Sequence, residues 1–170
     1  MTIPNPDHLL EQTDRLAAAP VVGPPRQADL RRAISTSYYA LFHAIATDVA
    51  DLMIGRRYRA TNQYELIYRS LEHTSLRNLC NEVQKQTLPA RYAKYEPASG
   101  FGDDIKAVAA AVAELQEKRH SADYNPLLKF RTSDAVLAVS TARAAIGRLR
   151  SAPSAKKRAF LPLCVVAPRS

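Results

Sequence analysis

The sequence predicts an all-α protein, an up-and-down bundle of four to five helices in a single domain. Proline is absent from three long windows, 26–88, 98–125 and 127–152, which are rich in the helix formers Ala, Leu, Arg and Glu. Apolar residues recur there at steps of three and four, and no segment shows the alternation typical of a strand. A chain of 170 residues is long enough to bury one hydrophobic core.

The first expected helix covers about residues 6–19. Asn5 is a favourable N-cap, and Pro6 fits the first helical position, where its missing N–H is not needed. The segment PVVGPP at 20–25 then predicts a rigid, exposed connector. Residues 1–25 are therefore expected to be an N-terminal helix and a Pro-rich connector.

The second expected helix, about 27–54, has the clearest pattern in the chain. Gly55 follows it, as is common after a helix C-terminus. Its apolar residues form one stripe: Leu30, Ile34, Tyr38, Leu41, Phe42, Ile45, Val49, Leu52 and Met53.

Residues 61–85 are expected to continue as helix with a turn or kink near 73–75, because two apolar stripes are offset there. Two prolines and a glycine make 86–101 a loop. The next helices are expected at about 103–124, which Pro126 ends, and at about 132–149.

The bundle itself is thus expected to span 26–150, and a basic and apolar tail to span 151–170. The tail contains the run FLPLCVVAP, which is too short to cross a membrane. We expect this run either to dock as an extended segment or to stay loose.

Composition excludes several classes of protein. Only two cysteines occur, Cys80 and Cys164, so neither a disulfide scaffold nor a paired CxxC zinc site is expected. The four histidines lack paired ligand spacing, and Gly100 and Gly102 follow no strand, so we expect no metal and no cofactor. With no signal-peptide pattern and no membrane-length apolar run, we expect a cytoplasmic protein and no membrane partner.

The net charge of +8 is concentrated near the C-terminus, where residues 131–170 hold eight basic residues and one acid. Such a segment is either a solubilising tail or a surface for a polyanion such as RNA. In the second case, deleting 152–170 should weaken the salt dependence of binding and leave the bundle folded. The candidate nucleic-acid residues are Arg143, Arg148, Arg150, Lys156, Lys157 and Arg158.

Arg119 continues the apolar stripe of the helix at 103–124, where an unpaired charge would be costly. Asp123 lies one turn later and is placed to pair with it, and Tyr124 follows. Two interpretations stay open. The pair is a structural ion pair, or Arg119 lines a polar cleft that holds a phosphate.

The second helix carries a matching polar edge, which includes Ser35. Its tyrosine hydroxyl and imidazole are expected to meet Arg119 and Asp123 across the bundle. The predicted polar cluster comprises Arg32, Tyr39, His43, Arg119, Asp123 and Tyr124.

Two segments resemble the HEPN superfamily of prokaryotic helical bundles: RRAISTSYYALFHAI at 31–45 and LQEKRHSADYNP at 115–126. YRSLEH at 68–73 is similar more weakly. The resemblance implies a bundle that is commonly dimeric, with RNA as a frequent ligand. It also implies a role in toxin–antitoxin or phage-defence systems, often beside a nucleotidyltransferase.

Catalytic members of that superfamily share an Arg, four to six residues, then a His. Here the first matching position after Arg119 holds Tyr124, and Arg69 and His73 are too close together. The chain instead resembles the non-catalytic variant Arg-x-x-Ala-Asp-Tyr. We expect a HEPN-like binding or dimerisation module. The alternative is a metal-independent ribonuclease that uses Arg119 with His120 or His43 as the base.

Overall fold

The computed structural model describes residues 3–18, 20 and 23–168, and every regular element in these residues is helical. The prediction of an all-α bundle is confirmed. In chain order the elements are α1 (Pro6–Ala17), α2 (Gln27–Met53), η1 (Arg56–Tyr58), α3 (Asn62–Arg69), α4 (His73–Val83), α5 (Ala90–Ala93), α6 (Asp103–Tyr124), α7 (Thr132–Ser151), α8 (Ser154–Phe160) and η2 (Leu161–Cys164).

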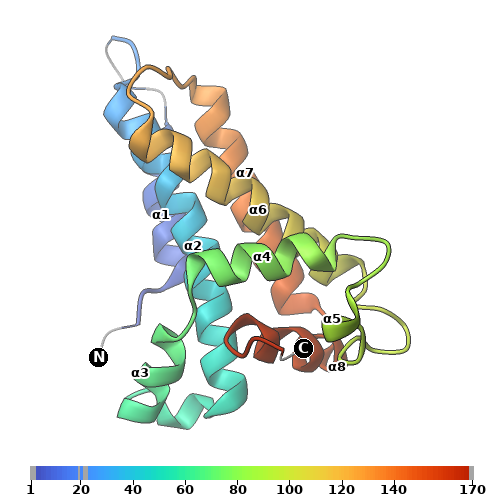
Figure 1. The fold of residues 1–170 in the computed structure, drawn as a ribbon. Coiled ribbons are helices and arrows are strands. Elements are labelled where there is room, and N and C mark those ends of the chain that lie inside the picture. Colours follow the sequence, from blue (N-terminus) through green and yellow to red (C-terminus); the bar gives the residue numbers. More distant parts are fainter. Residues whose placement is uncertain (1–2, 19, 21–22, 169–170) are drawn as a thin grey trace.

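The helices α1, α2, α6 and α7 run alternately up and down and form the body of the molecule (Figure 1). The short elements η1 to α5 connect α2 to α6, and α4 lies across α6 (Figure 1). No described helix combines the length and the apolar character that a membrane crossing requires.

The helix α2 is buried on several sides, because it packs against α1, α6 and α7 at once. The single apolar stripe expected from the sequence is only part of its buried surface. Small side chains complete it and allow the neighbouring helices to approach closely. They include Ala33, Ala40, Ala44, Ala46 and Ala50, each at most 7% exposed.

The cap residues expected from the sequence are found at the helix ends. The Asn5 side chain accepts a hydrogen bond from the Asp7 amide, as expected of an N-cap. Gly55 follows the end of α2 with φ of 105°, a conformation that favours glycine. The first helix ends at Ala17, whereas its expected last residue, Ala19, lies outside the described residues.

Two expectations about the middle of the chain need correction. Residues 61–85 form two separate helices, α3 and α4, and the break lies at 70–72 instead of 73–75. The expected loop at 86–101 contains the single-turn helix α5, where Tyr92 is buried. The buried ring gives this turn a packing role that the prolines around it did not indicate.

The tail is neither extended nor loose, so that expectation was wrong. Its residues form α8 and η2, and the side chains of Phe160, Leu161 and Cys164 are buried. The Phe160 ring packs edge-on against the ring of Phe101, with centroids 6.3 Å apart. Deleting 152–170 would therefore expose core surface, and the bundle would not keep its stability.

Arg31 on α2 holds the end of α6 in place. Its guanidinium donates hydrogen bonds to the carbonyl oxygens of Ala122 (2.7 Å), Asn125 (2.9 Å) and Leu128 (2.5 Å). The last carbonyls of a helix lack partners within the helix, and the positive charge also suits the negative end of its dipole. One side chain thus stabilises both α6 and the turn that follows it.

Gln27 fixes the same connection from the start of α2. Its side-chain amide donates to the Phe130 carbonyl at 2.8 Å and accepts from the Phe130 amide at 2.9 Å. The Phe130 ring also lies 5.3 Å from the guanidinium carbon of Arg31. The residues between α6 and α7 are therefore anchored to α2.

We predict that Arg31→Ala lowers the free energy of unfolding by about 2 kcal/mol, because it removes charge-assisted bonds to backbone carbonyls. Urea unfolding followed by circular dichroism measures this change. The neighbouring Arg32→Ala is the matched control, since Arg32 is exposed and should change stability by less than about 0.5 kcal/mol. Equal effects of the two variants would contradict the anchoring role.

Candidate functional site

The centre of the candidate site is the Arg119 guanidinium on the last turns of α6. The side chain is only 16% exposed, and its Nε donates to Asp123 Oδ2 at 3.0 Å. The predicted ion pair is confirmed. The Ser35 hydroxyl of α2 donates to the same carboxylate oxygen at 3.3 Å, so the pair also links α2 to α6.

Three tyrosine rings surround this guanidinium. Its central carbon lies 5.3 Å from the ring centre of Tyr39, 5.9 Å from that of Tyr38 and 6.0 Å from that of Tyr124. Cation–π attraction therefore holds the charge among the rings. The two terminal nitrogens of Arg119 donate no hydrogen bond to any residue that the structure describes.

His73, the first residue of α4, lies beside this group. The Tyr38 hydroxyl and His73 Nδ1 are 2.7 Å apart, and the imidazole packs on Phe42 with ring centres 4.1 Å apart. Burial, together with the charge of Arg119, lowers the pKa of His73 below its usual value. The imidazole is therefore mainly neutral at pH 7.

His43 on α2 has a similar arrangement. Its Nδ1 lies 2.7 Å from the Tyr68 hydroxyl, and the two rings stack nearly parallel, at 5°. Burial and the nearby His73 lower the pKa of His43, while burial raises the pKa of Tyr68 to about 12. Both imidazoles lie close to Tyr39, with ring centres 6.3 Å away for His43 and 6.0 Å for His73.

The predicted polar cluster is thus largely assembled. Tyr39, Asp123 and Tyr124 contact Arg119 directly, and His43 joins them through Tyr39. Arg32 is exposed and forms no ion pair with a described residue. His120, another candidate, is exposed and packs on Tyr124, with ring centres 5.1 Å apart.

Sequence reasoning missed the roles of Tyr38, Tyr68 and His73. Tyr38 stood in the expected apolar stripe, and its ring is indeed buried, yet its hydroxyl binds His73. Tyr68 and His73 are the first and last residues of the segment YRSLEH, which was the only signal in the sequence. That segment gave no indication of which helix either side chain would meet.

The basic residues predicted to bind nucleic acid lie in the second half of α7 and on α8. Lys156 donates to the Ser99 hydroxyl and to the Gly100 carbonyl, whereas Lys157 and Arg158 form no ion pair within the described chain. The three arginines of α7 each pair with an aspartate of another helix: Arg143 with Asp14, Arg148 with Asp104 and Arg150 with Asp7. These pairs neutralise part of the expected basic surface.

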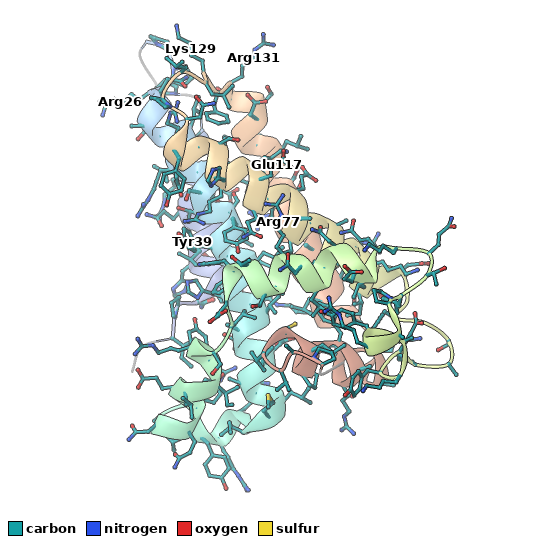
Figure 2. All side chains as sticks on the ribbon, viewed as in Figure 1. Arg26, Tyr39, Arg77, Glu117, Lys129 and Arg131 are labelled. Atoms are coloured by element: carbon teal, nitrogen blue, oxygen red, sulfur yellow. The ribbon has the colours of Figure 1, made fainter. Side chains whose placement is uncertain are left out.

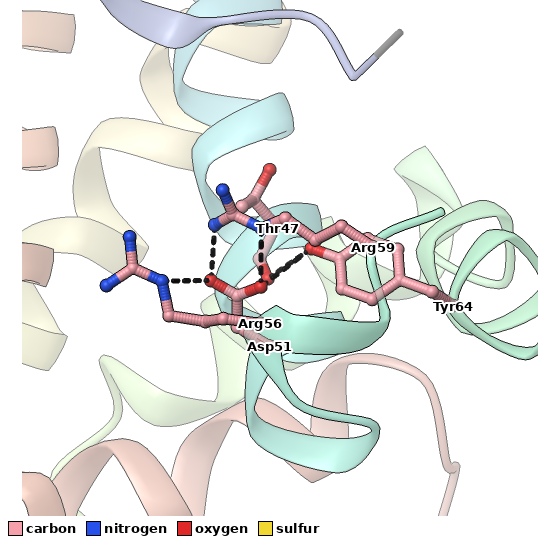
Figure 3. Close-up of polar contacts among 5 residues, drawn as sticks. All are labelled: Thr47, Asp51, Arg56, Arg59 and Tyr64. Atoms are coloured by element: carbon pink, nitrogen blue, oxygen red, sulfur yellow. Dashed lines mark hydrogen bonds and ion pairs between the residues drawn. The ribbon is translucent and has the colours of Figure 1, made fainter. Parts of the chain in front are cut away.

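A second polar group lies at the other end of α2, around Asp51 (Figure 3). The carboxylate accepts from the Arg59 guanidinium at 2.9 and 2.5 Å and from the Tyr64 hydroxyl at 2.9 Å, with Arg56 3.6 Å away. These contacts tie η1 and α3 to α2. The group borders a cavity of about 560 Å³ whose lining contains as many arginines as aspartates.

Metal and thiol chemistry have little basis in the described part of the chain. No group of three or more His, Cys, Asp or Glu side chains there is arranged to hold a metal ion. Cys80 and Cys164 are buried, and burial raises the pKa of both thiols. Neither sulfur is therefore available as a thiolate nucleophile at neutral pH.

Comparison with known proteins identifies no relative. No family model matches the chain, and neither the curated proteins nor the solved structures contain a significant match.

The lowered pKa values predict that acidification destabilises the fold. Below pH 6.5 the unfolded histidines bind protons that the folded His43 and His73 do not, so the free energy of unfolding should fall. It should stop falling, for these groups, once the pH is below their lowered folded-state pKa values.

NMR titration of the imidazole signals checks this directly. In Arg119→Gln, the pKa of His73 should rise part of the way toward its usual value, because burial remains and only the neighbouring charge is lost. Lys118→Gln is the matched control, since Lys118 pairs with Glu114 on the surface. Folded-state pKa values at or above 6.5 in the wild-type protein would contradict the assigned environment.

Proposed function

We propose that this chain is a HEPN-like helical module that binds RNA and holds one phosphate at Arg119. One observation carries the proposal. The guanidinium is fixed by Asp123 at Nε and by the three tyrosine rings, while its terminal nitrogens have no partner among the described residues. A guanidinium so placed can bind a phosphate with two parallel hydrogen bonds.

The surrounding rings favour RNA over a small anion. Tyr124 is 65% exposed, and Tyr39 is half-buried beside the guanidinium. Unstacked bases bind on aromatic rings of this kind, and their contribution depends little on sequence. A phosphate site next to aromatic rings therefore suits a single-stranded segment.

The resemblance to the HEPN superfamily extends the proposal to partners and setting. It favours a cytoplasmic homodimer in a prokaryotic toxin–antitoxin or defence system, with a nucleotidyltransferase-type protein as a further partner. Light scattering after size-exclusion chromatography measures the oligomeric state. No cofactor and no membrane partner belong to the proposal.

A metal-independent endoribonuclease is the second candidate, favoured by the two neutral imidazoles near Arg119. One imidazole would take the proton of the 2′-hydroxyl as its oxygen attacks phosphorus. The leaving 5′-oxygen would receive its proton from solvent, which gives a 2′,3′-cyclic phosphate and a 5′-hydroxyl. Arg119 would stabilise the charge on the phosphoryl oxygens.

We predict that Arg119→Ala weakens binding of a single-stranded oligonucleotide at least tenfold, since a charged hydrogen bond contributes roughly 1.5–3 kcal/mol. Arg119→Lys should be intermediate, because it keeps the charge and loses the paired donors. Fluorescence anisotropy gives the affinities. Lys118→Ala, one residue away and outside the cluster, should bind as the wild-type protein does.

The second candidate has a separate test. If the chain is a ribonuclease, nuclease-free protein should release products ending in 2′,3′-cyclic phosphate with EDTA present. His43→Ala with His73→Ala should abolish that release, whereas the exposed His120→Ala should not. Binding without cleavage would leave the first proposal and remove the second.

A further inference from the structure

We infer that single-stranded RNA held at Arg119 continues onto one end of the bundle, which binds its backbone through Arg26, Lys129 and Arg131. These three residues are called the basic end below. All three side chains are exposed and point away from the body at the same end of the molecule (Figure 2). The inference rests on the proposed function.

A pair of hydrogen bonds joins the two segments that carry the three charges. Gln27 exchanges hydrogen bonds with the backbone of Phe130, at 2.8 and 2.9 Å. Arg26 precedes Gln27, and Lys129 and Arg131 stand on either side of Phe130. Two segments about a hundred residues apart in the chain thus bring their cations to one place.

The three side chains of the basic end are unpaired in the described part of the chain, where Asp29 and Asp134 are the acids nearest to them in sequence. None of its three side chains forms an ion pair there, and the Asp134 carboxylate is engaged by the Arg131 backbone amide at 2.7 Å. Like charges gathered in this way repel one another. A polyanion relieves that repulsion and releases its condensed counterions.

The basic end lies close to the Arg119 site along the chain. From Arg119, α6 runs only to Tyr124 before the connection that carries Lys129 and Arg131 begins. At 1.5 Å per residue, Arg119 lies roughly 8 Å along the axis from the end of the helix. Arg31 holds this end of α6 against α2, so Arg119 and the basic end keep a fixed spacing.

The aromatic surface between them favours RNA over an acidic protein. Tyr124 is exposed at the end of α6, and His120 packs against it at 5.1 Å. Bases stack on such rings, whereas acidic side chains gain nothing from their apolar faces. A chain of alternating phosphates and bases matches both the charges and the rings.

The salt dependence of binding tests the assignment. A labelled 20-nucleotide oligouridine is titrated with full-length protein at several salt concentrations. The triple variant Arg26→Gln, Lys129→Gln, Arg131→Gln should flatten the plot of log K against log salt by about 2, at roughly 0.7 for each phosphate that the variant no longer neutralises.

The matched control is a second triple variant, which removes three positive charges from α7. Arg143→Gln, Arg148→Gln, Arg150→Gln changes arginines that are paired with aspartates, and it should leave the slope unchanged. Circular dichroism of both triple variants confirms that each is folded. Since all substitutions are on the surface, neither variant should lose its helical signal.

Each of the other outcomes contradicts either this inference or the proposed function. An unchanged slope in the basic-end variant, with binding still sensitive to Arg119→Ala, overturns this inference and leaves the proposed function intact. Equal flattening in both triple variants would show that binding depends on total charge and not on the basic end, and it would also overturn this inference. Competition by polyglutamate as strong as by oligouridine indicates an acidic protein instead, and a wild-type protein that binds no RNA refutes the proposed function itself.

Discussion

The fold depends on burying α2 on several sides at once. A helix in that position meets a different neighbour on each side. Polar groups that do not bond within the helix, as the Ser37 hydroxyl does to the Ala33 carbonyl, therefore need a partner from another element. Ser35 therefore pairs with Asp123, the Tyr38 hydroxyl with His73, and Arg31 with the carbonyls that end α6. The candidate site is formed by the polar groups that this burial requires to be paired.

Local signals explain what the sequence could predict. The limits of α2, α6 and α7 depend on prolines, a glycine and apolar spacing within each segment, so they agree with expectation within about two residues. The break before His73 and the packing of the tail depend on distant contacts. Arg119 and Asp123 were predictable because they are one turn apart on one helix, whereas Tyr38 and His73 are separated by 35 positions.

The distribution of positive charge along the sequence also differs from its distribution in the folded protein. By sequence, the positive excess belongs to the C-terminal quarter. In the folded chain, Asp7 and Asp14 of α1 and Asp104 of α6 come to lie against the arginines of α7. The unpaired cations Arg26, Lys129 and Arg131 gather at another end, because α2 anchors the connection that bears two of them (Figure 2). Charge summed along a segment therefore did not show which cations the fold pairs with aspartates.

The lowered pKa values of His43 and His73 also limit what the central site can do alone. With both imidazoles mainly neutral at pH 7, and with Asp123 balancing part of its charge, Arg119 offers a phosphate little net positive charge. Its advantage is position, since the rings and the ion pair hold the guanidinium before any ligand arrives, so little ordering is needed on binding. In the proposed function, Arg119 and the tyrosines therefore orient the RNA, and long-range attraction has to come from unpaired cations elsewhere on the surface.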